Sequence, residues 1–271
     1  MNRAAEKDFA SLFRLPQPHS RLESISSIIT VSSVFTAAVL TAILYFTFLL
    51  EDVNHEYSLL AATFFLGVSV YTLNKVTDVK EDSINLPDRT RFVKNHRTSL
   101  LFVSLESLSI AIVFAFFSNP YAILLIVFAF YAGAFYSVGV NKTRTKDVLF
   151  MKNLTVAGAV TIGAVLFPLF IHVGSLLIIT FVAYFIFLKV FINTVLFDVR
   201  DMEGDQKAGA RTIPIYLGRE KTRNVLLLLN STLIVWIGFS FFAGLFFPYH
   251  IVLVVSLLYA YWYILRYTRA N

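Results

Sequence analysis

The chain has 271 residues, of which 57% are hydrophobic and only 15% are charged, with a mean hydropathy of +0.71. A soluble domain is usually about half apolar and about a quarter charged. This composition therefore excludes a soluble globular protein and predicts an integral membrane protein. Cysteine is absent, which excludes disulfides, thiolate metal sites and cysteine nucleophiles.

The amino-terminal segment, residues 1–20, is polar and basic, with Phe9, Leu12 and Phe13 interspersed. This pattern predicts an amphipathic helix that lies at the membrane surface. A specific binding role for the segment is the alternative. We expect the whole chain, 1–271, to form a single transmembrane domain that begins with this interfacial segment.

Long apolar segments follow one another through the rest of the chain. A helix needs about 20 apolar residues to cross the bilayer. Eight segments of this kind can be read, approximately at 25–50, 57–75, 98–118, 120–140, 153–172, 174–197, 222–246 and 249–267. The predicted fold class is therefore all-α, a polytopic transmembrane helical bundle.

The basic residues indicate how these spans are oriented. All Lys and Arg residues except Lys189 fall in the amino-terminal segment, in the loops after spans two, four and six, or in the carboxy-terminal tail. The opposite loops carry only acidic charges, including Glu51, Asp52 and Glu56. By the positive-inside rule we expect a multi-pass cell-membrane protein with both termini in the cytoplasm.

Two acidic motifs end spans two and six, on the side predicted to be cytoplasmic. They are Asn74-x3-Asp78-x3-Asp82 and Asp198-x2-Asp201-x3-Asp205. Spacings of three and four residues place each set on one helix face. Clustered carboxylates need a counter-charge, and oxygen ligands without His or Cys favour a hard cation, Mg²⁺ or Ca²⁺.

The two motifs also occupy matching places. Spans one to four and spans five to eight each carry an acidic motif at the end of their second helix. This favours two four-helix halves with a site between them. Carboxylate clusters that face each other across a cavity suit a diphosphate held between metal ions. The alternative is that these are ordinary carboxylates in solvated loops. Two motifs in matching positions favour this alternative less than a single motif would.

Other polar and aromatic residues near the spans leave alternatives open. Glu106 and Lys189 lie within spans three and six, either as an ion pair or at the bottom of a substrate cavity. Four aromatic residues near the ends of spans two and four suit the wall of an apolar tunnel or the stabilisation of a carbocation, and equally an interfacial aromatic belt. They are Tyr71, Tyr131, Phe135 and Tyr136. No Walker loop or dinucleotide fingerprint is present, and we expect no nucleic-acid partner.

The motifs, with Lys207-x-Gly209 and Thr212-x-Pro214-x-x-Leu217-Gly218 after the second, resemble those of the UbiA superfamily of intramembrane prenyltransferases. Asp88-Arg89, Tyr136-Ser137 with Lys142, and Asn153 resemble further family segments. The resemblance implies a helical bundle around a central cavity, usually of nine spans where eight can be read here. It also implies Mg²⁺-dependent transfer of an isoprenyl group, from a donor such as geranyl or geranylgeranyl diphosphate, to an aromatic quinone precursor or a lipid acceptor.

The resemblance also implies roles for individual residues. It implies two Mg²⁺ ions that bridge the diphosphate. Their expected ligands are Asn74, Asp78, Asp82, Asp198, Asp201 and Asp205. Of these, Asp78, Asp82, Asp198 and Asp201 are the expected catalytic residues. The expected diphosphate-binding residues are Asn74, Arg89, Arg91, Tyr136, Lys142 and Asn193. The alternative function is a membrane transporter for a cation or a phosphate ester. An internal repeat and charges within the membrane spans are also features of transporters.

Overall fold

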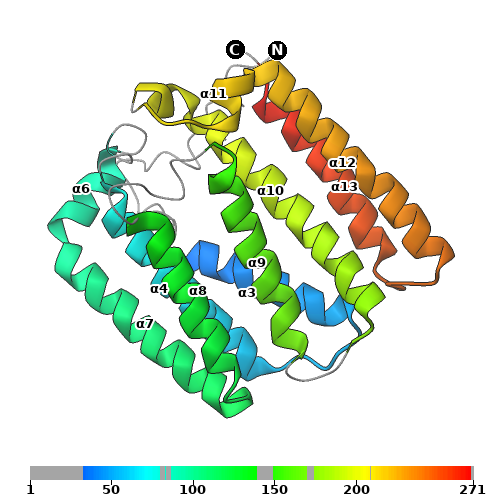
Figure 1. Cartoon of the computed structure of the whole chain (residues 1–271), viewed down its shortest axis with the longest axis horizontal. Helices are drawn as coiled ribbons and strands as arrows, with labels where there is room; N and C mark the ends of the chain where they lie inside the picture. Colours follow the sequence, from blue (N-terminus) through cyan, green and yellow to red (C-terminus); the bar gives the residue numbers. More distant parts are fainter. Residues whose placement is uncertain are drawn as a thin grey trace, which may run out of the picture.

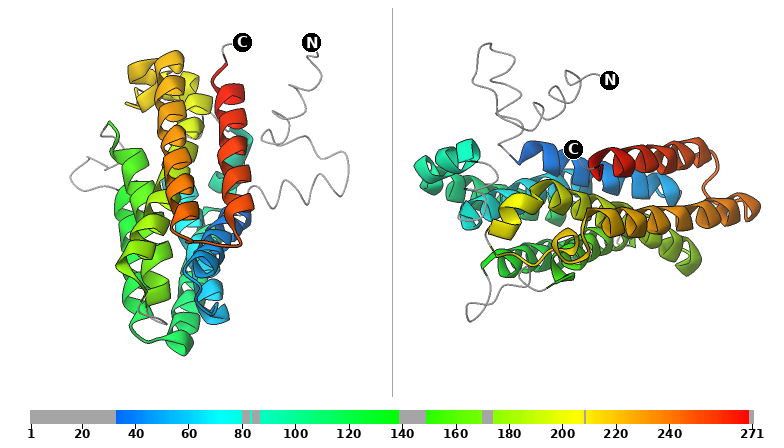
Figure 2. Two further views of the ribbon diagram at one scale, coloured as in Figure 1. Left: turned by 90° about the vertical axis from the view of Figure 1, so that its right-hand side faces the viewer. Right: turned by 90° about the horizontal axis from the view of Figure 1, so that it is seen from above.

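The structure, a computed structural model, describes residues 33–79, 83, 87–138, 149–169, 174–207 and 209–269. The side chains of residues 87–88 and 135–138 are outside this description, although their backbone is helical. All regular elements in the described ranges are helices (Figures 1 and 2). The prediction of an all-α fold is therefore confirmed.

Eight apolar helices follow the order of the predicted spans. They are α3 (Val34–Leu50), α4 (Tyr57–Thr77), α7 (Arg97–Ser118), α8 (Ala122–Val138), α9 (Met151–Leu169), α10 (Leu176–Lys207), α12 (Arg219–Phe242) and α13 (His250–Tyr267). Six of them are long and apolar enough to cross a membrane, and α3 and α8 are shorter apolar helices. Two short helices, α6 (Pro87–Asn95) and α11 (Ile213–Leu217), lie between spans.

The helices pack as two groups joined near the middle of the molecule. In the first group α4 packs against α3, α7 and α8; in the second, α10 packs against α9, α12 and α13. The groups meet where α3 packs against α9 and α10, and where α8 packs against α9. Figure 1 shows α7 and α12 at opposite margins of the bundle. This arrangement agrees with the two predicted four-helix halves.

Close packing in the first group depends on small residues. A Cβ atom added to Gly67 of α4 would lie 2.9 Å from the Cα atom of Ala37 on α3. Between α4 and α7, the Ser69 hydroxyl donates to the Ser104 carbonyl at 2.7 Å, and the Ser104 hydroxyl donates to the Ser69 carbonyl at 2.9 Å. Small and hydroxyl residues let membrane helices approach closely and hydrogen-bond to each other.

We expect Gly67→Val to destabilise the protein, by about 1–3 kcal/mol, because the larger side chain forces α3 away from α4. Thermal unfolding in detergent measures the effect. Gly158→Ala in α9 is the matched control, since a Cβ atom there meets no other atom within 4 Å. Equal unfolding temperatures for the two variants would show that the α3–α4 contact is not tight.

The two intramembrane charges, Glu106 and Lys189, are not paired with each other. The Lys189 ammonium of α10 donates to the Ser256 carbonyl of α13 at 2.7 Å and lies 5.8 Å from the centre of the Phe185 ring. Glu106 is exposed on α7, in the other half of the bundle. The predicted Glu106–Lys189 ion pair is therefore wrong, because Lys189 uses a backbone acceptor on a neighbouring helix.

Glu51 follows the last residue of α3 and is only 8% exposed. Its Oε1 atom has no hydrogen-bond partner within the described part of the chain. Burial raises the pKa of the Glu51 carboxyl from 4.5 to about 7, because desolvation disfavours the ionised form.

This shift predicts a pH-dependent stability. The unfolded chain releases the Glu51 proton at lower pH than the folded protein, so the free energy of unfolding should fall as pH rises from 4.5 to about 7. Glu51→Gln should lack this component. Thermal unfolding of both proteins at about pH 5 and about pH 8 tests the difference. The same pH dependence in both would contradict the assignment to Glu51.

Candidate active site

The second acidic motif lies near the end of the longest described helix. Helix α10 has 32 residues, which is about 48 Å at a rise of 1.5 Å per residue. The apolar core of a bilayer is only about 30 Å thick. Asp198, Asp201 and Asp205 belong to the last third of α10, beyond its long apolar stretch. The helix therefore presents these carboxylates at one membrane face.

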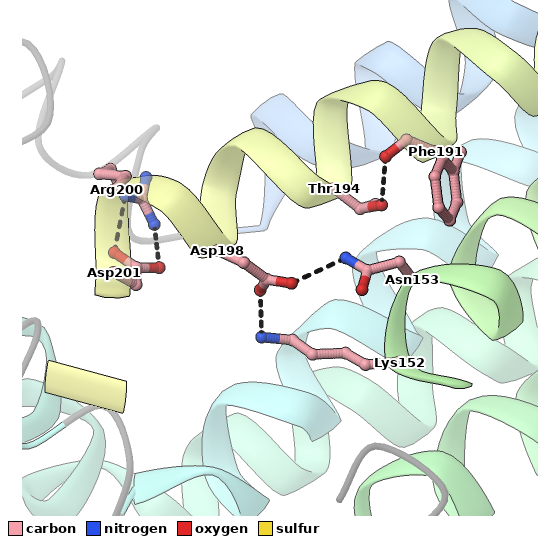
Figure 3. Close-up of polar contacts among 7 residues, drawn as sticks. All are labelled: Lys152, Asn153, Phe191, Thr194, Asp198, Arg200 and Asp201. Carbon is pink, nitrogen blue, oxygen red and sulfur yellow. Dashed lines mark hydrogen bonds and ion pairs between the residues drawn. The ribbon is translucent and has the colours of Figure 1, made fainter. Parts of the chain in front are cut away.

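Asp198 is the most enclosed carboxylate of the motif, with a relative exposure of 1%. Both of its oxygens accept hydrogen bonds from the first turn of α9 (Figure 3). The Lys152 ammonium lies 2.5 Å from Oδ1, and the Asn153 side-chain amide donates to Oδ2 at 2.8 Å. An enclosed carboxylate needs positive charges or hydrogen-bond donors that compensate its lost hydration. Lys152 and Asn153 supply that compensation.

The connection of α9 to α10 explains why these residues meet. The two helices pack against each other and follow each other in the chain, so they run in opposite directions. The start of α9 then lies beside the end of α10, as Figure 1 shows. Since spans alternate in direction, the end of α4 belongs to the same face of the bundle.

Asp201 and Asp205 have different surroundings. The Arg200 guanidinium donates twice to the Asp201 carboxylate, at 2.8 and 2.7 Å (Figure 3). This pair is partly exposed, and Arg200 also lies over the Phe197 ring, 5.1 Å from its centre. Asp205 is 9% exposed, and its backbone carbonyl accepts from the Ala210 N–H in the turn that ends α10.

The first motif ends α4, as the sequence predicts. Asn74 lies in the last turn, and Asp78 is the residue that caps the helix. The Asp78 backbone N–H donates to the Asn74 carbonyl at 2.9 Å, and the Thr77 hydroxyl lies 3.3 Å from Asp78 Oδ1. Both motif residues are half-buried. Asp82, the third residue of the motif, lies outside the described residues.

The predicted diphosphate-binding residues differ in their exposure, and the side chains of some are outside the described part of the chain. On α6, Arg89 is half-buried and Arg91 is exposed. Asn193 is exposed on α10 and precedes Asp198 by five residues, which turns it about 140° around the helix from that carboxylate. Lys142 lies outside the described residues, and Tyr136 belongs to α8 with a side chain that is not described. Their roles at the diphosphate stay predictions.

The donor chemistry suits a hard divalent cation. Among the described residues, no three His, Asp or Glu side chains come together closely enough to hold a metal ion. The α4 and α10 motifs nevertheless offer only oxygen ligands, which is the set that Mg²⁺ prefers. The residues therefore fit Mg²⁺. Asp198 and Asp201 are already paired with Lys152 and Arg200, so a metal ion at either carboxylate would compete with a cationic side chain.

Sequence reasoning missed Lys152 as a partner of the second motif and counted it only among the basic residues of a cytoplasmic loop. It noted Asn153 from the family resemblance alone. A signal was present: Lys152-Asn153 begins span five, while Asp198 ends span six on the same membrane face. Consecutive antiparallel helices bring such positions to one level.

Curated relatives of this chain share one name. A digeranylgeranylglyceryl phosphate synthase of Thermococcus gammatolerans is 30% identical over 204 residues, which cover 72% of this chain and 69% of that protein. The protein of the same name from Thermococcus kodakarensis is 31% identical over 158 residues. That match covers 57% of this chain and spans about half, 53%, of the relative.

Solved structures share the fold. The apo structure of a UbiA homolog from Aeropyrum pernix matches with a TM-score of 0.64 at 15% identity, over 87% of this chain and 92% of the other. A UbiA homolog from Archaeoglobus fulgidus bound to GPP and Mg²⁺ matches with a TM-score of 0.62 at 19% identity. It covers 88% of this chain and 85% of the homolog.

The sequence model of the UbiA prenyltransferase family matches residues 34–271, which include both acidic motifs and all eight apolar helices. The resemblance inferred from the motifs is thereby confirmed. The chain belongs to the UbiA prenyltransferase family and is a multi-pass membrane prenyltransferase.

Proposed function

We propose that this enzyme transfers a geranylgeranyl group from its diphosphate to a hydroxyl of a glyceryl phosphate lipid, with Mg²⁺ as the required metal. The observation that carries the proposal is the pair of oxygen-rich motifs, ending α4 and α10 at one face of an apolar bundle. Relatives named digeranylgeranylglyceryl phosphate synthase support the donor and the acceptor. The Archaeoglobus homolog bound to GPP and Mg²⁺ supports the metal–diphosphate assignment.

The proposed metal ligands are the motif residues. Asn74, Asp78 and Asp82 would contribute from the end of α4, and Asp198, Asp201 and Asp205 from α10. Bound Mg²⁺, two ions in our proposal, would supply positive charge that stabilises the departing diphosphate.

The protein's own groups prepare this reaction. Asn153 holds Asp198 Oδ2 at 2.8 Å and fixes the direction of the carboxylate. Arg89, Arg91, Tyr136, Lys142 and Asn193 are proposed to bind the diphosphate. The C1–O bond of the donor would break with its electron pair on the diphosphate and leave an allylic cation. The acceptor oxygen would then bond to C1 and release its proton to the departing diphosphate. The surrounding apolar helices exclude water, which would otherwise capture the allylic cation.

We further propose that both termini and the site face the cytoplasm, in a single domain over 1–271. The concentration of Lys and Arg in alternate loops supports this orientation. An aromatic quinone precursor is the other acceptor that the sequence leaves open, and the names of the curated relatives favour the lipid. Membership in the prenyltransferase family favours a transferase over a transporter.

The test is an assay of purified protein with Mg²⁺, radiolabelled geranylgeranyl diphosphate and a panel of acceptors. Mass spectrometry identifies the product. We expect label in a glyceryl phosphate lipid that carries one more geranylgeranyl group, and none with Asp78→Ala or Asp198→Ala. Label only in an aromatic acceptor would overturn the lipid proposal. Full activity in either variant would overturn the assignment of the site.

A further inference from the structure

The two partners of Asp198 differ in their freedom to move. Asn153 is 1% exposed, and its short amide is enclosed between α9 and α10. The Lys152 side chain is 35% exposed, whereas the Asp198 side chain is 2% exposed. A lysine ammonium on a flexible four-carbon stem changes partners with little strain. Asn153 therefore fixes the carboxylate, and Lys152 is the partner that can leave.

Lys152 also carries the charge that compensates this part of the motif. Its ammonium interacts electrostatically with Asp198, Asp205 and Asp201, most strongly with Asp198. The Arg200 guanidinium is already engaged with Asp201. Lys152 thus supplies the positive charge that is paired with the Asp198 carboxylate.

The same contact opposes a metal ion. The ammonium lies 2.5 Å from Asp198 Oδ1, the oxygen that Asn153 does not occupy. Two cations on this one oxygen would repel each other, so a metal that binds there must displace Lys152. A diphosphate that arrives with the metal brings anionic oxygens to the displaced ammonium, and charge-assisted bonds to phosphate are strong.

We propose that Lys152 is an exchangeable counter-ion of Asp198. It neutralises the carboxylate in the substrate-free enzyme, competes there with the divalent cation, and moves to a diphosphate oxygen when the metal and the prenyl diphosphate bind. The inference rests on the proposed function, since it takes the metal–diphosphate to bind beside Asp198. The proposal predicts that Lys152 weakens the binding of a divalent cation alone and strengthens the binding of the prenyl diphosphate.

The test measures these two affinities separately in purified full-length protein. Mn²⁺, observed by electron paramagnetic resonance without substrate, reports the metal alone. Geranylgeranyl diphosphate binding at saturating Mg²⁺ reports the substrate. Removing an ion-paired hydrogen bond changes an equilibrium by roughly tenfold. Lys152→Met should therefore bind Mn²⁺ about tenfold more tightly and the diphosphate about tenfold more weakly than wild type.

Lys152→Arg provides a second variant that retains the charge. A guanidinium holds a carboxylate with two parallel bonds, so this variant should bind Mn²⁺ more weakly than wild type. The affinity for Mn²⁺ is thus expected to be highest in Lys152→Met, intermediate in wild type and lowest in Lys152→Arg. If Lys152→Met does not fold, the Mn²⁺ affinity of Lys152→Arg relative to wild type still tests whether Lys152 competes with the metal.

Lys221→Met is the matched control, because Lys221 is an exposed cation at the start of α12, on the same face of the bundle. It should change neither affinity. Mn²⁺ affinity that stays flat or reverses across the Lys152 series would overturn the inference. Failure of the proposed function has a different signature: wild-type protein would then show no Mg²⁺-dependent binding of geranylgeranyl diphosphate.

Discussion

Asp198→Asn is expected to lower kcat/KM for prenyl transfer by about 10²–10³-fold, which is the range found when one preorganised electrostatic group of an active site is removed. The substitution keeps the size of the side chain and removes its charge. It leaves the Lys152 ammonium without its anion and places a second amide against Asn153. Steady-state assays with the radiolabelled donor measure the loss.

Glu203→Gln is the control for this prediction. Glu203 lies in the same helix segment and is exposed, so its charge faces solvent. We expect kcat/KM to stay within about twofold of wild type, because exposed single charges contribute little. If the two variants lose activity equally, the effect belongs to the net charge of the helix end. Circular dichroism in detergent checks that both variants retain their helices.

Removal of divalent metal is expected to abolish activity completely, and added Mg²⁺ to restore it. Ca²⁺ should restore it poorly, because it is larger and takes six to eight ligands at about 2.3–2.6 Å in place of a compact octahedral set. The measurement is product formation after treatment with EDTA and titration with each metal.

The same treatment should leave the fold intact. Lys152 neutralises Asp198 and Arg200 pairs with Asp201 within the protein itself, so neither carboxylate needs a metal for stability. We expect the unfolding temperature of the substrate-free enzyme to change little on addition of EDTA. Unfolding caused by EDTA would indicate a structural metal and contradict this account of the site.

The fold was largely predictable from the sequence because each segment that crosses the bilayer must by itself be long and apolar enough to do so. Residues 98–118 and 222–246 satisfy the length and polarity of a span without reference to their neighbours, and α7 and α12 coincide with them closely. The ends of α4 and α10 were predictable for the same reason. Asp78 and Asp198 lie where an apolar stretch stops.

Contacts between helices were not predictable in the same way. Lys189 binds the carbonyl of Ser256, and a backbone acceptor leaves no mark on the sequence because every residue has one. The Glu106 carboxyl was expected to face inward, but its position on α7 is exposed. Lys152 was missed because its place in a basic loop does not by itself distinguish a lipid contact from a carboxylate contact. Only its position at the start of span five, level with Asp198 at the end of span six, indicates the pair.

Helix α3 packs against both α4 and α10, the two helices that end in the acidic motifs. A ligand bound by both motifs would act as a non-covalent cross-link between the two halves of the bundle. Donor binding would then stiffen the enzyme as a whole, and loss of diphosphate would loosen it.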